Sequence, residues 1–177
     1  MQYTTTYRSP LGEILLACDA SGLMGLWFEG EKFYAFGLDS EHEEKETPVF
    51  TETKRWLDIY FSGREPDFMP PLHMIGSHFQ LSVWELLTQI PYGETATYGD
   101  LAKRVAKKRG LSRMSAQAVG GAVGHNEISI IVPCHRVVGT DGSLTGYAGG
   151  VERKKKLLTL EGVDMTRLFV PTKGTAL

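Results

Sequence analysis

A proline-rich stretch near the middle of the chain limits the possible folds more than any other feature. The segment REPDFMPPLHMIGS, residues 64–77, holds three of the eight prolines of this 177-residue chain. Proline lacks a backbone donor and disfavours helical backbone in the preceding residue, so the segment favours an extended conformation. We therefore expect a linker that closes an N-terminal domain over residues 1–76, followed by a second domain over residues 77–177.

The N-terminal side of this linker carries mainly strand signals. Residues 12–30 contain two apolar runs around the turn-forming residues DASG, and this pattern predicts a β-hairpin. Residues 51–60 show helical spacing of their apolar positions. The acidic stretch EHEEKE, residues 41–46, lacks apolar periodicity and indicates a loop or the solvated start of a helix.

The C-terminal side carries helix signals. Residues 79–87 present an apolar helical face, Thr97 is a suitable N-cap for a helix over 98–109, and Ser115 is one for a small-residue helix over 116–126. Two short helices joined by a turn are a helix-turn-helix candidate. The glycines inside the second helix suit close approach to another surface, although the pattern alone slightly favours a packing contact between helices. The basic residues around them are Lys103, Arg104, Lys107, Lys108, Arg109 and Arg113.

Charge divides the chain in the same place. Residues 1–78 carry 6 Lys/Arg and 13 Asp/Glu, a net −7, whereas residues 79–177 carry 13 Lys/Arg and 8 Asp/Glu, a net +5. A basic half is typical of a domain that faces phosphate, but two solvated surfaces of different composition explain the asymmetry equally well. With no apolar window near the ~18 residues of a membrane span and no signal-peptide pattern, we expect a cytoplasmic protein without a membrane partner.

The stretch IIVPCHRVVG, residues 130–139, places a thiol beside an imidazole. The β-branched run over 128–132 predicts a strand that Pro133 ends, which would leave Cys134 facing a pocket. Only a thiolate attacks well, so a reactive Cys134 needs His135, a cation such as Arg136 or a helix N-terminus beside it. Neighbouring side chains on an extended chain point in opposite directions, so a water or a local bend would join thiol and imidazole.

An inert, buried cysteine remains the alternative at this position. The other cysteine, Cys18, ends the first apolar run of the hairpin, and a free cysteine there is most often a small buried hydrophobe. The basic run Lys154–Lys156 is expected to be a solvated face, with phosphate contact as the second possibility.

The segments PCHRVVG, GSLTGYAGG and LLTLEGV, in this order, resemble the active-site region of the O6-alkylguanine-DNA alkyltransferases, the methylated-DNA–protein-cysteine methyltransferases. The likeness continues upstream through AVGGAVGHN, PYGETATYGDLA and FQLSVWELL, covers residues 79–163, and extends loosely to SPLGEILLACDASGLMGLWF. It implies an α+β fold. A small N-terminal α/β domain with an antiparallel sheet would precede a mainly helical C-terminal domain with a winged-helix-like helix-turn-helix, which binds DNA and accepts the alkyl group.

The resemblance also implies a function. The chain would be a monomer that acts on double-stranded DNA carrying O6-alkylguanine, and on O4-alkylthymine as well, without a cofactor or a metal. It would flip the damaged base out from the minor groove and transfer the alkyl group to its own cysteine in one self-inactivating turnover.

Five residues would form the catalytic group by this resemblance. Cys134 would accept the alkyl group, His135 would act as a base through a water, and Glu161 would orient His135. Asn126 would bond the backbone around the active-site turn, and Tyr98 would donate a proton to guanine N3.

The remaining implied roles concern the base and the duplex. The carbonyls of Cys134 and Val137 would accept the exocyclic amine of guanine. The residues expected to contact the base are Val137, Tyr147, Ala148, Gly149 and Gln117. The residues expected to contact DNA are Thr97, Tyr98, Arg113, Ser115, Ala116, Gln117, Ala118, Gly121 and Arg136.

Two departures and two alternatives accompany the resemblance. Many family members carry an arginine where this chain has Gln117, and the basic connection AKKRGLSRM is longer here. An alkyltransferase-like protein that binds lesions without repairing them would lack the acceptor cysteine, so Cys134 argues against that reading. A cysteine hydrolase would use Cys134 and His135 but would not explain the basic helix pair.

Overall fold

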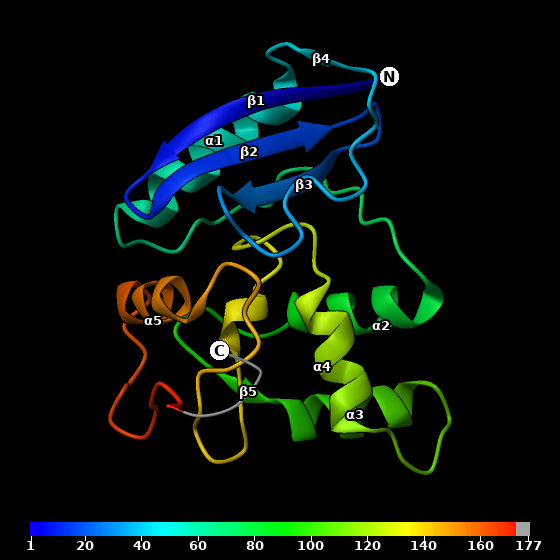
Figure 1. Ribbon diagram of the computed structural model, residues 1–177, viewed down its shortest axis with the longest axis vertical. Helices are drawn as coiled ribbons and strands as arrows, with labels where there is room; N and C mark the ends of the chain where they lie inside the picture. Colours follow the sequence, from blue (N-terminus) through cyan, green and yellow to red (C-terminus); the bar gives the residue numbers. More distant parts are fainter. Residues whose placement is uncertain (173–177) are drawn as a thin grey trace. The chain divides into compact units, whose positions relative to one another are not determined.

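The computed structural model describes residues 1–172, which divide into two compact units (Figure 1). Unit 1 comprises residues 1–75 together with Glu127–Ser129, and unit 2 comprises Gly76–Asn126 and the chain from Ile130 onward. The last five positions of the expected second domain, 173–177, lie outside the described residues.

Unit 1 is built on a four-stranded sheet in the order β3-β2-β1-β4. Its strands are β1 (Gln2–Ser9), β2 (Gly12–Cys18), β3 (Leu23–Phe28) and β4 (His42–Glu44). The expected hairpin is present as β2 and β3, which pair antiparallel. Within the acidic stretch over 41–46, residues 42–44 form β4, a fully exposed edge strand that pairs parallel with β1. The other three positions lie outside helices and strands, which agrees with the expected loop and not with a helix start. Charged side chains on a short edge strand discourage pairing with other chains.

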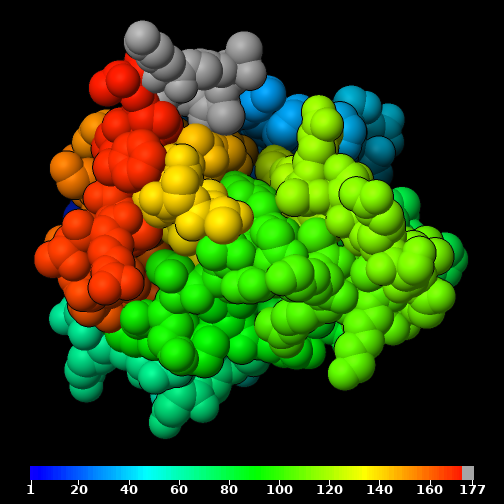
Figure 2. Space-filling model, turned by 90° about the horizontal axis from the view of Figure 1, so that it is seen from below, coloured from blue at the N-terminus to red at the C-terminus, as the bar shows by residue number. Residues whose placement is uncertain are grey.

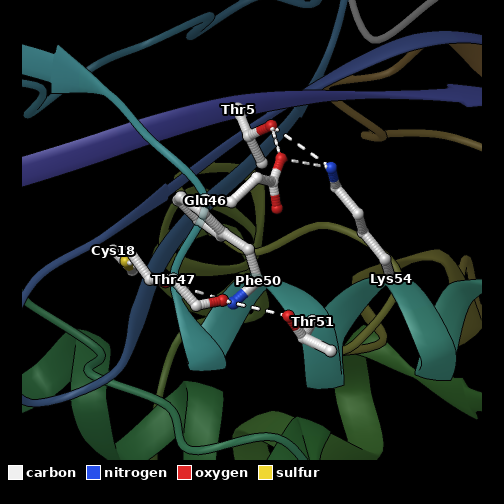
Figure 3. Close-up of polar contacts among 7 residues, drawn as sticks. All are labelled: Thr5, Cys18, Glu46, Thr47, Phe50, Thr51 and Lys54. Carbon is white, nitrogen blue, oxygen red and sulfur yellow. Dashed lines mark hydrogen bonds and ion pairs between the residues drawn. The ribbon is translucent and has the colours of Figure 1, made fainter.

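One helix, α1 (Pro48–Phe61), lies along a face of this sheet in Figure 1 and contacts its three longer strands. It begins where Thr47 Oγ1 accepts a hydrogen bond from Phe50 N at 3.3 Å and Pro48 occupies the first turn. Glu46 accepts from Lys54 Nζ at 2.6 Å and from the Thr5 hydroxyl, which connects the helix to β1 (Figure 3).

Three residues from much later in the chain complete unit 1. Leu26 of β3 exchanges backbone hydrogen bonds with Glu127 and Ser129, at 2.8 and 3.1 Å. Trp27 Nε1 also donates to the Glu127 carboxylate at 2.7 Å. Burial raises the pKa of Glu127 to about 7, although the bond from Trp27 opposes this. The three residues directly after Asn126 therefore belong to unit 1. The expected division into two contiguous domains does not include this return of the chain.

Unit 2 is mainly helical. Its elements are α2 (His78–Leu87), β5 (Ala96–Thr97), α3 (Tyr98–Lys108), α4 (Ala116–Gly124), a short 3₁₀ helix η1 (Cys134–Arg136), β6 (Val137–Val138) and α5 (Val151–Leu160). The N-caps expected from the sequence are confirmed: Thr97 accepts from Asp100 N, and Ser115 accepts from Gln117 N and Ala118 N. The α+β fold expected from the resemblance is also confirmed, since α3 and α4 form the helix pair and β5 pairs with β6.

The prediction of a strand over 128–132 is wrong. Ile128 makes only an isolated bridge to Leu26, and Ile130 has a φ of 69°, a left-handed backbone that ends any strand. The β-branched residues are buried, but they line a turning segment that precedes η1. Among residues 1–172, no helix is both long and apolar enough to span a bilayer.

The cap of α1 gives a test of local stability. Thr47→Ala is expected to lower the free energy of unfolding by about 1 kcal/mol, because the Phe50 amide loses its side-chain acceptor. Chemical denaturation monitored by circular dichroism measures this change. Thr51→Ala, an exposed position one turn into the same helix, serves as the control and should change stability by less than about 0.5 kcal/mol. Equal effects of both variants would contradict the capping role.

Candidate active site

Cys134 opens the 3₁₀ helix η1 and is 6% exposed. Pro133, with φ −82° and ψ 64°, forms an inverse γ-turn in which Cys134 N donates to Val132 O at 2.8 Å. The thiol and the imidazole of His135 therefore lie on a helical turn and not on an extended chain. A local bend was one of the two expected ways of bringing the thiol and the imidazole together, and a bridging water was the other.

The side-chain amide of Asn126 holds this turn and also reaches the sulfur. Its Nδ2 donates to Val132 O at 2.8 Å and to Cys134 Sγ at 3.2 Å. The backbone bond matches the role implied by the resemblance, whereas the bond to sulfur was not foreseen. A donor aimed at sulfur favours the thiolate over the thiol.

His135 is fully buried and faces a carboxylate. Its Nε2 lies 2.5 Å from Glu161 Oε2, so an ionised carboxylate there fixes the proton on Nε2. Burial lowers the pKa of His135, and this outweighs the opposing bond and charge of Glu161. Its Nδ1 is buried without a hydrogen-bond partner among residues 1–172. A neutral imidazole with a lone pair available on Nδ1 is the form that a general base requires.

Glu161 receives three donors in the interior. Besides His135, its Oε1 accepts from Arg136 Nε at 2.8 Å and from Gly93 N at 3.1 Å. Burial alone would raise the pKa of Glu161, but the hydrogen bonds and charges of His135 and Arg136 reverse this and hold the pKa at about 2. Glu161 is thus ionised at neutral pH and orients the imidazole.

Arg136 is not placed as the sequence suggested. We expected it to contact DNA and to be a possible cation beside the thiol, but it is 8% exposed and its Nη1 donates to Ile90 O at 2.7 Å. Its charge is paired with Glu161 in the interior. The structure therefore gives Arg136 an internal electrostatic role in place of a surface one.

Tyr98 stands at the first position of α3. Its hydroxyl donates to Thr145 O at 2.9 Å, and its ring lies against Gly120 of α4. Gly146 has a φ of 78°, and a Cβ there would lie 2.6 Å from the Tyr98 hydroxyl, so only glycine fits. Burial, and then the charge of Cys134, raise the pKa of Tyr98, which keeps the phenol protonated and able to donate.

The glycine-rich segment after β6 supplies the predicted base-contacting residues. Tyr147 is buried, and its ring is stacked on His135 with centroids 6.3 Å apart. Ala148 is half-buried, and Gly149 is buried and accepts a hydrogen bond from Arg153. Val137 is completely buried. The ring contact thus places Tyr147 beside the candidate base His135.

The exposed face of α4 carries the small residues expected to approach DNA. Val119, Ala122 and Val123 are buried on the inner face of the helix. The exposed positions are Ala116, Gln117, Ala118 and Gly121. Only one of these four has a long side chain, so the backbone of α4 can approach another surface closely.

All six basic residues around the helix pair are exposed, and Figure 2 looks onto the face where α3 and its following connection lie. Three of them are engaged within unit 2: Lys108 pairs with Glu85, Arg104 donates to Gln89 and Arg109 lies over Phe79. The other three, Lys103, Lys107 and Arg113, line an open groove of about 650 Å³ between α3 and the connection. This groove concentrates positive charge beside α4.

Lys154 is the functional candidate that sequence reasoning missed. The run Lys154–Lys156 was expected to be solvated, and Lys155 and Lys156 are exposed, but Lys154 is 0% exposed. Its Nζ donates to Val137 O at 2.5 Å and to Thr145 O at 2.7 Å. The i+3 and i+4 positions Leu157 and Leu158 are both buried, so helical periodicity was the available signal.

Cys18 differs from Cys134 in its surroundings. The residue is 1% exposed, its sulfur lies 3.4 Å from Thr47 Oγ1, and burial raises the pKa of its thiol. It is the small buried residue that the sequence indicated. Within residues 1–172, no group of three or more potential metal-binding side chains is present.

The buried carboxylate gives a stability test. Glu161→Gln is expected to lower the free energy of unfolding at pH 7 by about 3–5 kcal/mol, because the buried charge of Arg136 loses its counter-ion. Since the folded-state pKa of Glu161 is lowered, its stabilisation is present above the ordinary value of ~4.3 and is lost as the pH falls toward 2. The difference between wild type and variant should therefore shrink below about pH 4.

Denaturant titrations over this pH range measure the effect. Glu94→Gln removes the same charge at an exposed position directly after Gly93 and should leave stability within about 0.5 kcal/mol. A Glu161→Gln protein as stable as the Glu94→Gln control would mean that the buried pair contributes nothing.

Comparison with known proteins agrees with both units. The family described as "6-O-methylguanine DNA methyltransferase, DNA binding domain" matches residues 78–163, and its "ribonuclease-like domain" matches residues 2–74. A methylated-DNA–protein-cysteine methyltransferase of Methanosarcina acetivorans is 45% identical over 160 residues, covering 90% of this chain and 98% of the relative. One of Haemophilus influenzae is 41% identical over 162 residues, covering 91% of this chain and 87% of the relative.

A solved structure extends this agreement to three dimensions. The crystal structure of Mycobacterium tuberculosis OGT in complex with DNA matches with a TM-score of 0.77 and 40% identity, covering 90% of this chain and 92% of that one. The resemblance noted from the active-site segments is therefore confirmed over nearly the whole chain, and the chain belongs to the 6-O-methylguanine DNA methyltransferase family.

Proposed function

We propose that this chain repairs DNA directly by moving an alkyl group from O6 of guanine in double-stranded DNA to Sγ of Cys134. The names of its relatives describe methyl transfer from DNA to a protein cysteine, and one structural neighbour is a complex with DNA. The observation that carries the assignment is the chain of contacts around the thiol: Asn126 donates to its sulfur, and the adjacent His135 is held by Glu161.

The first step generates the thiolate. The proton of Cys134 passes through a water to Nδ1 of His135, which is buried without another partner in the described chain. The ionised Glu161 stabilises the imidazolium that forms, and the Asn126 amide stabilises the sulfur anion. The site thus separates charge inside the protein, where fixed groups replace water.

The second step is an in-line displacement. The thiolate forms a bond to the alkyl carbon, the carbon–O6 bond breaks, and its electron pair goes to guanine. Tyr98, whose raised pKa keeps it protonated, supplies a proton to guanine N3 and so offsets the charge that develops on the base. The proton that His135 took from the thiol then returns through water to the Tyr98 oxygen, so the thiol proton ends on guanine and both side chains regain their starting forms. The product is a thioether, and no group in the proposed mechanism cleaves it, so each molecule acts once.

The base must leave the helix to reach Cys134, because the alkyl group lies within the base stack. The small exposed face of α4 supports approach from the minor groove, with Gln117 occupying space that the flipped base vacates. Tyr147, Ala148 and Gly149 would lie against the base. The groove with Lys103, Lys107 and Arg113 supports binding of backbone phosphate.

Three finer features belong to the same proposal. The carbonyls of Cys134 and Val137 would accept the exocyclic amine of guanine, each through its second lone pair, since Val137 N and Lys154 Nζ already donate to them. O4-alkylthymine is a second substrate of the proposed site. We expect the chain to act as a monomer in the cytoplasm.

Stoichiometry tests the transfer. Incubation with excess duplex containing O6-methylguanine should add one methyl group per chain, located on Cys134 by peptide mass spectrometry. Cys134→Ser should abolish the mass shift, whereas Cys18→Ser should retain it, because the Cys18 thiol is buried beside Thr47. Sustained turnover of alkylated duplex, or methylation of Cys18 in its place, would refute the assignment.

Gln117 tests the placement of α4. Gln117→Arg should change the single-turnover repair rate by less than about tenfold, since glutamine already fills part of the space and arginine adds mainly charge. Thr51→Arg adds the same charge to an exposed position of unit 1 and controls for a general electrostatic effect. A Gln117→Arg protein that folds but has no repair activity would show that α4 does not approach the lesion as proposed.

A further inference from the structure

The base loop, residues 145–149, is the part of the chain that is proposed to lie against the flipped base. At its C-terminal end, Gly150 N donates to Tyr147 O at 3.0 Å, and α5 begins directly afterwards. Gly146 and Gly150 have φ angles of 78° and 93°, in the region that favours glycine. Glycines at both ends let the backbone of the loop turn. Its position therefore depends on what holds the chain that enters it.

A segment near the C-terminus pairs with that entering chain. Phe169 N donates to Gly142 O at 3.1 Å, and Phe169 O accepts from Leu144 N at 2.9 Å. These two bonds form an isolated parallel bridge between Ser143 and Phe169. Residues 165–170 form the C-terminal strap, which lies in red beside the gold residues before the base loop in Figure 2. One residue of the strap thus uses both of its backbone groups to hold the chain that leads into the base loop.

The two backbones are in direct contact at Gly142. This glycine has a φ of 93°, and a Cβ there would lie 2.1 Å from Arg167 O, so no side chain fits between the strap and the loop. Within the strap, Leu168 N donates to Met165 O at 3.1 Å and so closes a turn. The strap therefore has a local shape that presents Phe169 to the chain before the base loop.

Apolar packing holds the strap in this place. The buried residues of the cluster beneath it are Val138, Leu144 and Leu158. The strap residues that pack against this cluster are Met165, Leu168 and Val170. Removal of these side chains from water stabilises the strap, and the backbone bonds fix its register. The ring of Phe169 is 46% exposed and does not belong to this cluster, so position 169 can be changed without opening the core.

The base loop limits the space beside the acceptor sulfur in the proposed reaction. Its Tyr147 is stacked on His135, the neighbour of Cys134. An alkyl group on the bound base has to fit between the sulfur and this loop. A loop that is held at both ends leaves a space of fixed size, whereas a loop released at its N-terminal end can turn about its glycines and enlarge that space.

From this geometry we infer that the C-terminal strap determines which alkyl groups the site accepts. The backbone bonds of Phe169 to Gly142 and Leu144 fix the base loop, and the fixed loop favours small alkyl groups over large ones. The inference rests on the proposed function and deepens it, since it concerns the substrate range of the same site. It adds no step to the reaction.

Proline at position 169 tests the strap. Phe169→Pro removes the N–H that donates to Gly142 O, whereas Phe169→Ala removes only the exposed ring and keeps both backbone bonds. Two duplexes of one sequence, containing O6-methylguanine or O6-benzylguanine, give a ratio of single-turnover rates, benzyl over methyl. Phe169→Pro should raise this ratio at least about fivefold over the parent, and Phe169→Ala should leave it within about twofold. Kd for undamaged duplex should stay within about twofold in both variants.

Hydrogen exchange measured by mass spectrometry reports on the loop itself. Exchange over residues 142–149 should rise about threefold or more in Phe169→Pro and should stay at the parent level in Phe169→Ala. A protein that is only less stable would transfer both alkyl groups more slowly, and its ratio of rates would not change.

The outcomes separate the inference from the proposed function. A parent that accepts neither alkyl group refutes the proposed function, and the inference with it. An active parent whose ratio equals that of Phe169→Pro overturns only the inference, whether or not exchange rises. If the parent accepts methyl alone, benzyl transfer by Phe169→Pro supports the inference and its absence overturns it. If circular dichroism shows that Phe169→Pro is unfolded, the same ratio is decided by Leu168→Ala, which weakens the packing of the strap and keeps every backbone bond.

Discussion

The buried carboxylate of Glu161 is the interaction on which the rest of the site depends. It accepts from His135, Arg136 and Gly93, and so connects α5 to η1 and to the turn after α2. An ionised carboxylate in the interior is stable only with such donors, and in turn it fixes the tautomer of His135. The orientation of the His135 imidazole and the stability of unit 2 therefore both depend on Glu161.

The sequence predicted the parts of the fold that local chemistry controls. Thr97 and Ser115 are cap residues, and the helices begin directly after them. The same reasoning failed over 128–132, because a run of β-branched residues suits a buried turn as well as a strand, and only Ile130's left-handed backbone distinguishes them. The short strand β4 was missed because its pairing with β1 is long-range and its residues are acidic.

The candidate site was inferred mainly from resemblance to a family and much less from the spacing of its residues. Cys134 and His135 are adjacent in sequence, but their relation to Glu161 and Asn126 depends on how distant segments meet. Arg136 was expected to contact DNA because of the resemblance, and Lys154 was assigned to the surface because charged side chains usually lie there. Each is buried because the folded backbone supplies acceptors, Ile90 O for one and Val137 O for the other, which the sequence does not reveal.

In the proposed mode of DNA binding, the composition of the outer face of α4 has a consequence for how damage is found. A helix that distinguishes base pairs by their edges needs several long polar side chains, and this face offers alanine, glycine and a single glutamine. Such a surface would not distinguish one surrounding base pair from another. Selection of a lesion would then depend on how easily a weakened base pair opens. The same alkylated guanine should therefore be found faster where its neighbours stack poorly.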